Sequence, residues 1–298
     1  MKEKPFSKYQ ILANAVMIIW TLAIILPFIL LFMSSITDEN TLVANGYSFF
    51  PKKFSLASYS YIIKSRGQIL KAYGVSIGVT VVGTLLNVLL SALMAYPLSV
   101  KNLPGRNVMM FFVFFTMLFN GGLVPTYINY TTVFHVKDTF FGLLVPSLMM
   151  SAFNVLLMKS YFVTGVPDEI LEAAYIDGAK EFQTMWKIAI PLSKPIITTV
   201  AMFSGIAYWN DWNNGYIYLT KRTDLYSIQN LLNRLMQNIQ ALTQNANNMA
   251  QAGEGLSQIP PGTVRMAMAA LGILPIMIIY PFIQKNFVKG ITLGGVKG

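Results

Sequence analysis

Six apolar stretches, each long enough to cross a lipid bilayer, constrain this chain more than any other feature of its sequence. A helix needs about 20 residues to span a hydrocarbon core of roughly 30 Å. The stretches cover residues 11–33, 73–100, 108–130, 140–162, 195–218 and 263–283. The first three contain no charged side chain. The sequence therefore predicts an all-α polytopic membrane protein with six transmembrane helices.

The composition agrees with a membrane protein. Only 11% of the residues are charged, whereas soluble domains average about 25%. The net charge of +10 would also suit a nucleic-acid partner, but the lysines and arginines are scattered through the loops, where anionic lipid accounts for them. We therefore expect contact with membrane lipid and not with nucleic acid. The chain has no cysteine, which excludes disulfides, thiolate metal ligands and cysteine nucleophiles.

An even number of spans places both termini on the same side of the membrane. The loops after residues 100 and 162 and the segment after residue 283 carry cations at a higher density than the longer loops on the other side. This distribution favours cytoplasmic termini by the positive-inside rule. The stretch at residues 11–33 is longer than the apolar region of a signal peptide and has no small-residue cleavage site after it, so we expect it to be retained.

The third stretch is the most interrupted of the six. Its segment NGGLVPTYINY places Asn120, Gly121, Gly122 and Pro125 inside one apolar run. Broken helices at membrane depth often line a cavity. Small residues also permit two helices to cross closely, and the sequence leaves both interpretations open.

One loop between apolar stretches looks unlike the rest of the chain. Residues 172–195 read EAAYIDGAKEFQTMWKIAIPLSKP, with acids and lysines at helical spacing. Upstream, Pro167 and two following acids favour a first helical turn. Asp177-Gly178 favours a break, because glycine accepts the left-handed conformation of a sharp turn, and a second short helix is expected over residues 181–189. We interpret this cytoplasmic helix-turn-helix as a segment gripped by another protein.

The pattern EAA-x-x-DGA, followed by I-x-x-P, resembles the cytoplasmic loop signature of the membrane subunits of bacterial ATP-binding-cassette (ABC) importers. The matching positions are Glu172, Ala173, Ala174, Asp177, Gly178, Ala179, Ile188 and Pro191. The chain departs from the signature at Met185, where phenylalanine is usual. The resemblance implies a type I ABC importer permease fold in the bacterial plasma membrane, with this loop as a coupling helix that docks in a cleft of the ATPase subunit. An ordinary amphipathic cytoplasmic loop is the alternative.

Three further stretches resemble the carbohydrate-importing branch of that family. YSFFPKKFSLASY follows the first span, NGGLVPTYI lies in the third, and FVKGITLGGVKG ends the chain. The last one resembles the tail of the maltose-type second permease subunit, which implies that Gly294, Gly295 and Lys297 contact the ATPase subunits. The expected organisation is a first span and outer loop at residues 1–72, a permease core at 73–285 with a coupling loop at 163–194 and an outer loop at 219–262, and a cytoplasmic tail at 286–298.

The fifth stretch contains the segment YWNDWNNGYIY. Asp211 is its only charge and lies about 24 Å along a helix from Pro195. An ionisable residue at that depth is a candidate functional residue, and aromatic faces beside hydrogen-bonding side chains suit a neutral sugar. The expected cargo-cavity residues are Asn120, Tyr127, Trp209, Asn210, Asp211, Trp212 and Asn213. An aromatic belt at the membrane interface is the alternative.

The outer loop before the last span contains an amphipathic pattern. Residues 228–242 place leucine and isoleucine on one helical face and asparagine and glutamine on the other, which predicts a helix. Residues 243–262 lose this period and predict an irregular tip. The resemblance to maltose-type importers implies that residues 227–259 contact the binding protein. A helix lying flat on the outer membrane surface is the alternative.

The resemblance implies that the chain is the permease subunit of an ATP-driven importer that moves a carbohydrate, in particular an oligosaccharide, by alternating access. Its implied partners are a homologous second permease subunit, two ATPase subunits and an extracellular solute-binding protein. No G-x-x-x-x-G-K-[ST] motif is present, so we expect ATP and magnesium on the ATPase and no cofactor or metal on this chain. No catalytic constellation is visible, so we expect no enzyme activity. The alternatives are a peptide, amino acid or inorganic anion as cargo, a channel, and a membrane-embedded enzyme.

Overall fold

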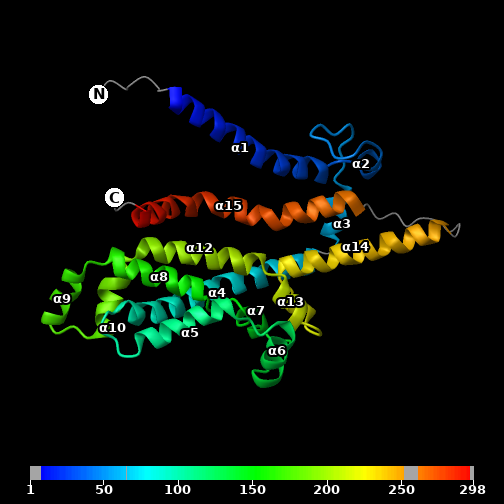
Figure 1. Cartoon of the computed structure of the whole chain (residues 1–298). Coiled ribbons are helices and arrows are strands. Elements are labelled where there is room, and N and C mark those ends of the chain that lie inside the picture. The colour runs from blue at the N-terminus through cyan, green and yellow to red at the C-terminus, as the bar shows by residue number, and fades with distance from the viewer. Residues whose placement is uncertain (1–7, 65, 252–260, 296–298) are drawn as a thin grey trace. The chain divides into compact units, whose positions relative to one another are not determined.

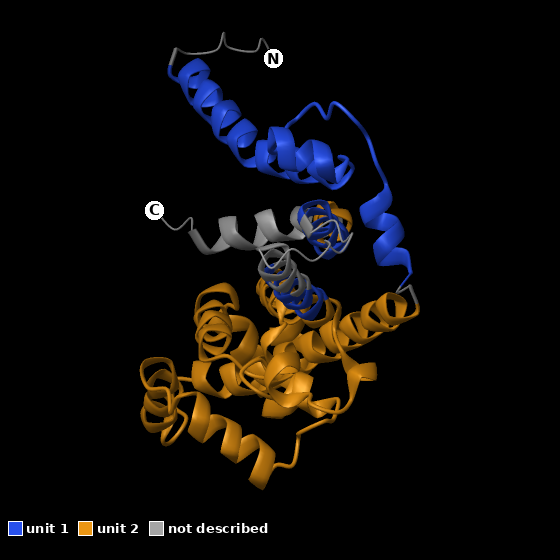
Figure 2. Ribbon diagram, turned by 90° about the vertical axis from the view of Figure 1, so that its right-hand side faces the viewer, with its two compact units in different colours: residues 1–66, 232–275 blue, residues 67–231, 276–298 orange. Residues whose placement is uncertain are grey.

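The computed structural model describes residues 8–64, 66–251 and 261–295. Within these ranges the regular secondary structure is helical, and an isolated antiparallel bridge joins Thr37 to Phe54. The chain divides into two compact units, coloured separately in Figure 2: unit 1 comprises residues 1–66 and 232–275, and unit 2 comprises residues 67–231 and 276–298. Helices α14 (Ile228–Gln251) and α15 (Pro261–Gly295) contribute residues to both units.

Unit 1 is built from α1 (Lys8–Ser35), α2 (Glu39–Asn45), α3 (Ala57–Ile63) and parts of α14 and α15 (Figure 1). The Glu39 carboxylate accepts hydrogen bonds from the backbone N–H groups of Gly262 and Thr263, both at 2.8 Å. It also accepts one from the Thr263 hydroxyl at 2.7 Å. Because the first N–H groups of a helix have no partner within the helix, this carboxylate stabilises the start of α15.

Unit 2 contains the predicted coupling loop and all three interrupted spans. Its helices are α4 (Arg66–Ser99), α5 (Arg106–Leu118), α6 (Leu123–Ile128), the π-helix η1 (Asn129–Val133), α7 (Phe141–Leu144), α8 (Ala152–Gly165), α9 (Asp168–Ile176), α10 (Glu181–Thr184), the π-helix η2 (Met185–Ala189), α11 (Ile190–Leu192), α12 (Lys194–Asn210), α13 (Asn213–Tyr218) and the 3-10 helix η3 (Thr223–Leu225). The main core lies between α4, α8 and α12, where Ala95, Val155 and Val200 are fully buried. In Figure 1, α9 and α10 lie at one end of this unit, and α6 and α13 lie at the other.

Three of the expected spans form single long helices. Helices α1, α4 and α15 cover the stretches predicted at residues 11–33, 73–100 and 263–283, and each is long and apolar enough to cross a membrane. Up to five spans result if each of two bent helix pairs is taken as one. The apolar side chains of α1 are exposed along the helix, as expected of a span that meets lipid.

Two other expected spans are interrupted. In the third stretch, α5 and the helix formed by α6 and η1 meet at 115°, and Gly122 at the break has a φ of +85°. The predicted interruption there is therefore confirmed. In the fifth stretch α12 ends at Asn210, so a continuous helix to residue 218 was wrong.

The fourth expected span, residues 140–162, is not a continuous helix. Helix α7 ends at Leu144 and α8 begins at Ala152. Ser147 between them has a φ of +64°, and Pro146 has no N–H to donate to a helical hydrogen bond. The prediction of an unbroken helix was wrong here because these two residues end it.

Helix α14 confirms the amphipathic helix predicted from residue 228 and continues to Gln251. The irregular tip expected from residue 243 was therefore wrong up to residue 251, and residues 252–260 lie outside the described residues. Asn230, which the pattern places on the polar face, is fully buried, and its Nδ2 donates to the carbonyl oxygen of Trp212 at 3.0 Å. The first turn of α14 is thus bonded to the segment that precedes α13.

Candidate functional site

The loop predicted to couple to the ATPase folds as short helices joined by a tight turn. Pro167 stands just before α9 rather than inside its first turn, and Asp168 and Glu169 occupy that turn, where acids favour the helix dipole. Gly178, after the end of α9, has a φ of +82°, and an added Cβ would meet nothing within 4 Å. The backbone conformation, and not a lack of space, therefore requires glycine at this turn.

The second half of the loop runs through α10, η2 and α11. The backbone N–H of Lys180 donates to Gln183 Oε1 at 3.1 Å, which caps the start of α10. Met185 and Ala189 are buried in the core of unit 2. Methionine is flexible and apolar, so the departure from the family signature at Met185 keeps an apolar core contact.

The predicted coupling residues all lie on these helices and their connecting turn. Ala174 is buried and Ala179 is half-buried, and the exposed members are Glu172, Ala173, Asp177, Gly178 and Pro191. Two large apolar side chains beside them are open to their surroundings: Ile176 is 86% exposed and Phe182 is 65% exposed. An exposed apolar patch on a folded loop is typical of a protein-binding surface.

Polar contacts hold the loop to neighbouring helices, and sequence analysis did not identify them. Glu181 Oε2 accepts hydrogen bonds from the hydroxyl groups of Tyr175 at 2.9 Å and Tyr96 at 3.3 Å. This carboxylate therefore joins α10 to α9 and to the end of α4. At the start of α9, Lys101 Nζ lies 2.7 Å from Asp168 Oδ2. No short motif marks the ties to Tyr96 and Lys101, because these residues lie far from the loop in the sequence.

Two of the three residues predicted to contact the ATPase subunits lie at the end of α15. Gly294 and Gly295 belong to its last turn, because the helix ends at Gly295. Lys297 lies outside the described residues. The last helix thus continues past the expected end of the sixth span at residue 283 and into the predicted tail.

The predicted cargo residues of the fifth span do not surround one cavity. Trp209 is buried and lines a cavity of about 430 Å³ whose walls include Thr84 of α4 and Tyr280 of α15. Asp211 instead caps α13, because its Oδ1 accepts hydrogen bonds from the N–H groups of Asn213 at 3.0 Å and Asn214 at 3.2 Å. This local bonding accounts for an acid at this position. Asn210, Trp212 and Asn213 are exposed.

The two cargo residues predicted in the third span also make local contacts. Asn120 Oδ1 accepts a hydrogen bond from the N–H of Gly122 at 2.8 Å, within the break. The ring of Tyr127 stacks on that of Tyr218, with 5.9 Å between the ring centroids. The structure thus brings the third span against the end of α13.

A buried cluster of polar side chains joins α4, α8 and α12, and sequence analysis missed it. Asn87 Oδ1 accepts hydrogen bonds from Ser204 Oγ at 2.7 Å, from Asn154 Nδ2 at 2.9 Å and from Ser91 Oγ at 3.4 Å. Each of the four residues is at most 5% exposed. Their signal in the sequence was a few polar residues within each apolar stretch, which do not reveal their partners.

Buried side chains also donate hydrogen bonds to backbone carbonyl groups at the break in the fourth span. Three of them each donate one hydrogen bond of 2.8–2.9 Å to a carbonyl oxygen of the break. The pairs are Asn87 with Leu148, Tyr208 with Leu144, and Asn214 with Pro146. Non-helical backbone at membrane depth requires such partners, so these side chains stabilise the interruption.

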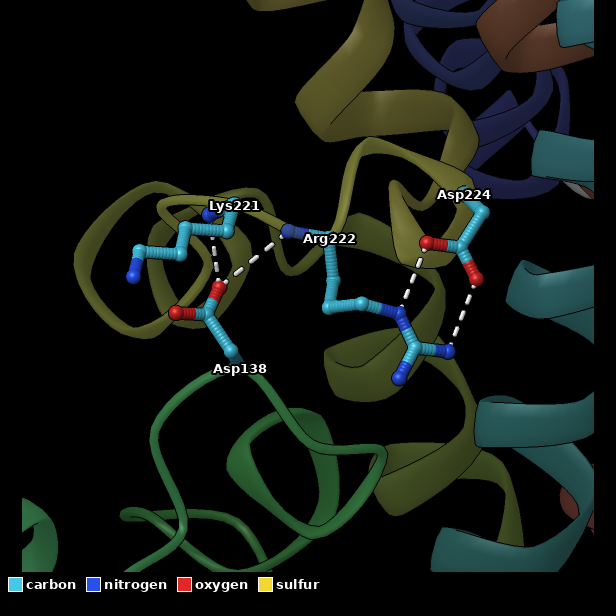
Figure 3. A network of polar contacts seen from close by, with 4 residues as sticks. All are labelled: Asp138, Lys221, Arg222 and Asp224. Atoms are coloured by element: carbon cyan, nitrogen blue, oxygen red, sulfur yellow. Dashed lines mark hydrogen bonds and ion pairs between the residues drawn. The ribbon is translucent and has the colours of Figure 1, made fainter.

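At the opposite end of unit 2, Asp138 closes a junction between two loops (Figure 3). Its carboxylate accepts hydrogen bonds from the backbone N–H groups of Thr220, Lys221 and Arg222 at 2.7, 2.8 and 3.2 Å, and from the Thr220 hydroxyl at 2.8 Å. These hydrogen bonds, the one from Lys221 N–H first, hold the pKa of Asp138 well below its usual range. Asp138 has a φ of +54°, a conformation that aspartate tolerates better than most residues.

A second acid stabilises the same junction. The Arg222 guanidinium donates two hydrogen bonds to Asp224, from Nε to Oδ1 and from Nη2 to Oδ2, both at 2.8 Å. This pair, also visible in Figure 3, lowers the pKa of Asp224. Among the described residues, no three His, Cys, Asp or Glu side chains lie close enough to hold a metal ion.

Comparison with known proteins identifies the class of this chain. A family model described as "Binding-protein-dependent transport system inner membrane component" matches residues 69–293. The chain belongs to this family. It is therefore a multi-pass membrane component of a transport system that works with a binding protein, and the matched region includes the whole coupling loop.

Two Bacillus subtilis proteins are similar over nearly the whole chain. Protein LplC is 36% identical over 275 residues, which cover 92% of this chain and 90% of that protein. The polygalacturonan/rhamnogalacturonan transport system permease protein YtcP is 36% identical over 290 residues, which cover 97% and 98% respectively. Among solved structures, a chain from a bacterial ABC transporter involved in the import of the acidic polysaccharide alginate aligns with a TM-score of 0.78 at 28% identity, covering 95% of this chain and 100% of that one. The fold is that of a type I ABC importer permease.

Proposed function

We propose that this chain is a transmembrane permease subunit of an ATP-driven importer that carries a carbohydrate, in particular an oligosaccharide, into the cell. The names of YtcP and of the alginate importer support the carbohydrate cargo, as does an arabinooligosaccharide permease of Bacillus subtilis that is 25% identical over 297 residues, covering 98% of each chain. The family itself supports delivery of the cargo by a binding protein.

The observation that carries this proposal is the geometry of the coupling loop. Its backbone turns at Gly178, its polar contacts tie it to α4, and it leaves Ile176 and Phe182 uncovered. We assign the docking surface for the ATPase to Glu172, Ala173, Ala174, Asp177, Gly178, Ala179 and Pro191. A small, exposed Ala173 permits close approach of another backbone, and the apolar side chains next to it supply buried area on docking.

The proposed assembly contains a homologous second permease subunit, two ATPase subunits and an extracellular binding protein. ATP and magnesium bind to the ATPase subunits, which carry out hydrolysis, and this chain binds no cofactor. We assign six spans to the chain, with the third, fourth and fifth interrupted, and both termini to the cytoplasm. Gly294, Gly295 and Lys297 extend toward the ATPase subunits.

We further propose that cargo moves by alternating access. Closure of the ATPase subunits displaces the coupling loop and opens the cargo pathway outward, and hydrolysis returns it. Asn120, Tyr127, Trp209, Asn210, Asp211, Trp212 and Asn213 remain our candidates for the pathway wall. Trp209 is the strongest of them, because it combines burial with a position on a cavity wall.

The test is transport by the purified assembly in proteoliposomes, with its binding protein outside and ATP inside. We expect ATP-dependent accumulation of a tritium-labelled oligosaccharide from a panel of oligogalacturonides, rhamnogalacturonan, arabinan and alginate fragments. Labelled amino acids and dipeptides serve as the comparison cargoes. Accumulation of an amino acid or dipeptide in place of every carbohydrate would retire the carbohydrate proposal, and failure to co-purify with any ATP-hydrolysing subunit would retire the importer itself.

A further inference from the structure

The two helices that flank the coupling loop meet at one side chain of a third helix. Helix α8 leads into α9, and α12 follows α11. Asn154 in the first turn of α8 and Ser204 in α12 both donate to Oδ1 of Asn87 in α4, at 2.9 and 2.7 Å. We infer that Asn87 is a positioning residue: it is the fixed pivot about which α8 and α12 tilt when the ATPase subunits move the coupling loop. This inference rests on the proposed function.

The position of the contact along each helix fits a pivot. With a rise of 1.5 Å per residue, Asn154 lies about 16 Å from the end of α8 at Gly165. Ser204 lies about 15 Å from the start of α12 at Lys194 on the same basis. The two arms from the coupling loop to Asn87 are therefore almost equal, so a displacement of the loop tilts both helices through similar angles.

The segment before α8 separates this helix from α7. Residues 145–151 are not helical, so α8 is not rigidly continuous with α7. The Nδ2 of Asn87 donates to the carbonyl oxygen of Leu148 within this segment at 2.8 Å. One side chain thus holds α8, α12 and the non-helical connection at a common point.

Packing alone does not account for these polar residues. The three helices already share the buried apolar side chains of Ala95, Val155 and Val200. A buried amide is costly unless it is hydrogen-bonded, and apolar or small residues at the same positions would pack without that requirement. What hydrogen bonds add is a contact at a defined point, which a shared pivot for both arms requires.

The experiment compares Asn87→Leu with the matched control Asn214→Leu in the reconstituted assembly. Asn214 is also buried, and its Nδ2 donates to the Pro146 carbonyl oxygen of the same interrupted segment at 2.9 Å, but it bonds to neither α8 nor α12. ATP hydrolysis and uptake of the tritium-labelled oligosaccharide that the wild type accumulates fastest are measured together. For Asn87→Leu we expect uptake per ATP hydrolysed to fall by about five- to tenfold, in the range of coupling mutations. Hydrolysis itself stays within about twofold of the wild type, as does the uptake per ATP of the control.

An unchanged uptake per ATP hydrolysed in Asn87→Leu would overturn the pivot. An equal loss of uptake per ATP in Asn87→Leu and Asn214→Leu would overturn it too. If Asn87→Leu does not assemble, Ser204→Ala decides. It removes the bond from α12 to Asn87 and the direct 3.2 Å bond from Asn154 Nδ2 to Ser204 Oγ, but it keeps the bond between Asn154 and Asn87. It should lower uptake per ATP by about two- to threefold, and an unchanged ratio counts against the inference. A wild-type assembly that hydrolyses ATP without accumulating any carbohydrate would overturn the proposed function and the pivot with it. If the wild type and Asn87→Leu both accumulate carbohydrate with the same uptake per ATP hydrolysed, the pivot alone is overturned.

Discussion

The two ends of unit 2 use their loops in opposite ways. At one end, the Asp138 carboxylate accepts four hydrogen bonds from residues 220–222, so two loops are closed against each other. At the other end, the coupling loop has fewer polar ties, through Glu181 and Asp168, and it leaves Ile176 and Phe182 exposed. The first end satisfies its own polar groups, and the second presents an apolar surface that lacks cover.

This difference indicates which end moves with a partner. A loop whose backbone N–H groups are all directed at one carboxylate resists deformation, because any shift breaks several hydrogen bonds together. A loop with exposed apolar side chains gains stability when a partner covers them. The predictions below test this contrast, from the largest expected effect to the smallest.

Replacing Gly178 with glutamate should have the largest effect. A side chain at a φ of +82° costs about 1–2 kcal/mol of backbone strain, and the new charge lies beside the apolar docking surface. We expect ATP-driven uptake to fall by about tenfold or more, equivalent to at least 1.4 kcal/mol of coupling. Uptake into proteoliposomes and membrane insertion are measured side by side.

The matched control for this change is Gly105→Glu. Gly105 also has a positive φ, +75°, and open space around an added Cβ, but it precedes α5, outside the coupling loop. It should show the same backbone strain and retain most of the uptake. Equal losses in both variants would mean that strain, and not docking, explains the Gly178 result.

The sequence predicted only one of the two ends that this contrast compares. The coupling loop was predictable because its signals are local: Asp177 and Gly178 adjoin, and the motif spans few residues. The Asp138 junction was not, because the carboxylate and its donors lie more than 80 residues apart. The hydrogen bonds that stabilise the break at Pro146 and Ser147 were missed for a related reason, since the donors Asn87 and Tyr208 come from other helices. Tertiary hydrogen bonds overrode a strongly apolar pattern there.

Removing the Asp138 carboxylate should loosen the junction between Asp138 and residues 220–222. In Asp138→Gly the four hydrogen bonds are lost without backbone strain, because glycine accepts a φ of +54°. Trypsin cleaves after Lys221 and Arg222, so we expect cleavage there to quicken by about tenfold as local opening becomes easier. Mass spectrometry of the fragments in detergent measures it.

Asp138→Asn and Asp224→Ala sharpen this result. Asparagine tolerates the same backbone conformation and keeps one acceptor oxygen, so its cleavage rate should lie between those of the glycine variant and the wild type. Asp224→Ala frees the Arg222 guanidinium but leaves the Asp138 bonds in place, so it should resemble the wild type. Equal protection in Asp138→Gly and the wild type would show that the carboxylate does not close this end.

Acid should weaken the same junction within a defined pH window. The folded protein lowers the pKa of both Asp138 and Asp224, so each carboxylate contributes stability above its unfolded pKa of about 3.9. That contribution is lost as the pH falls from there through the folded pKa.

After correction for intrinsic exchange, amide hydrogen exchange at residues 220–222 should be constant from about pH 6 to 4. Below that it should quicken by up to about tenfold per pH unit for each proton taken up. Asp138→Gly should show a weaker dependence, and a wild-type profile that is flat down to pH 3 would contradict the role of these acids.

Lys101→Ala should have the smallest effect, although its ion pair holds the start of α9 in the coupling loop. The hydrogen bond to Asp168 raises the pKa of Lys101, so the lysine stays charged and paired throughout the neutral range. Both side chains are well exposed, however, and water and salt screen such pairs. We expect uptake to stay within about twofold of the wild type, with a difference that shrinks as salt is added. If Lys101→Ala instead abolishes uptake as Gly178→Glu does, the coupling loop is positioned by this ion pair, and the tie between Glu181 and α4 is not sufficient to hold it.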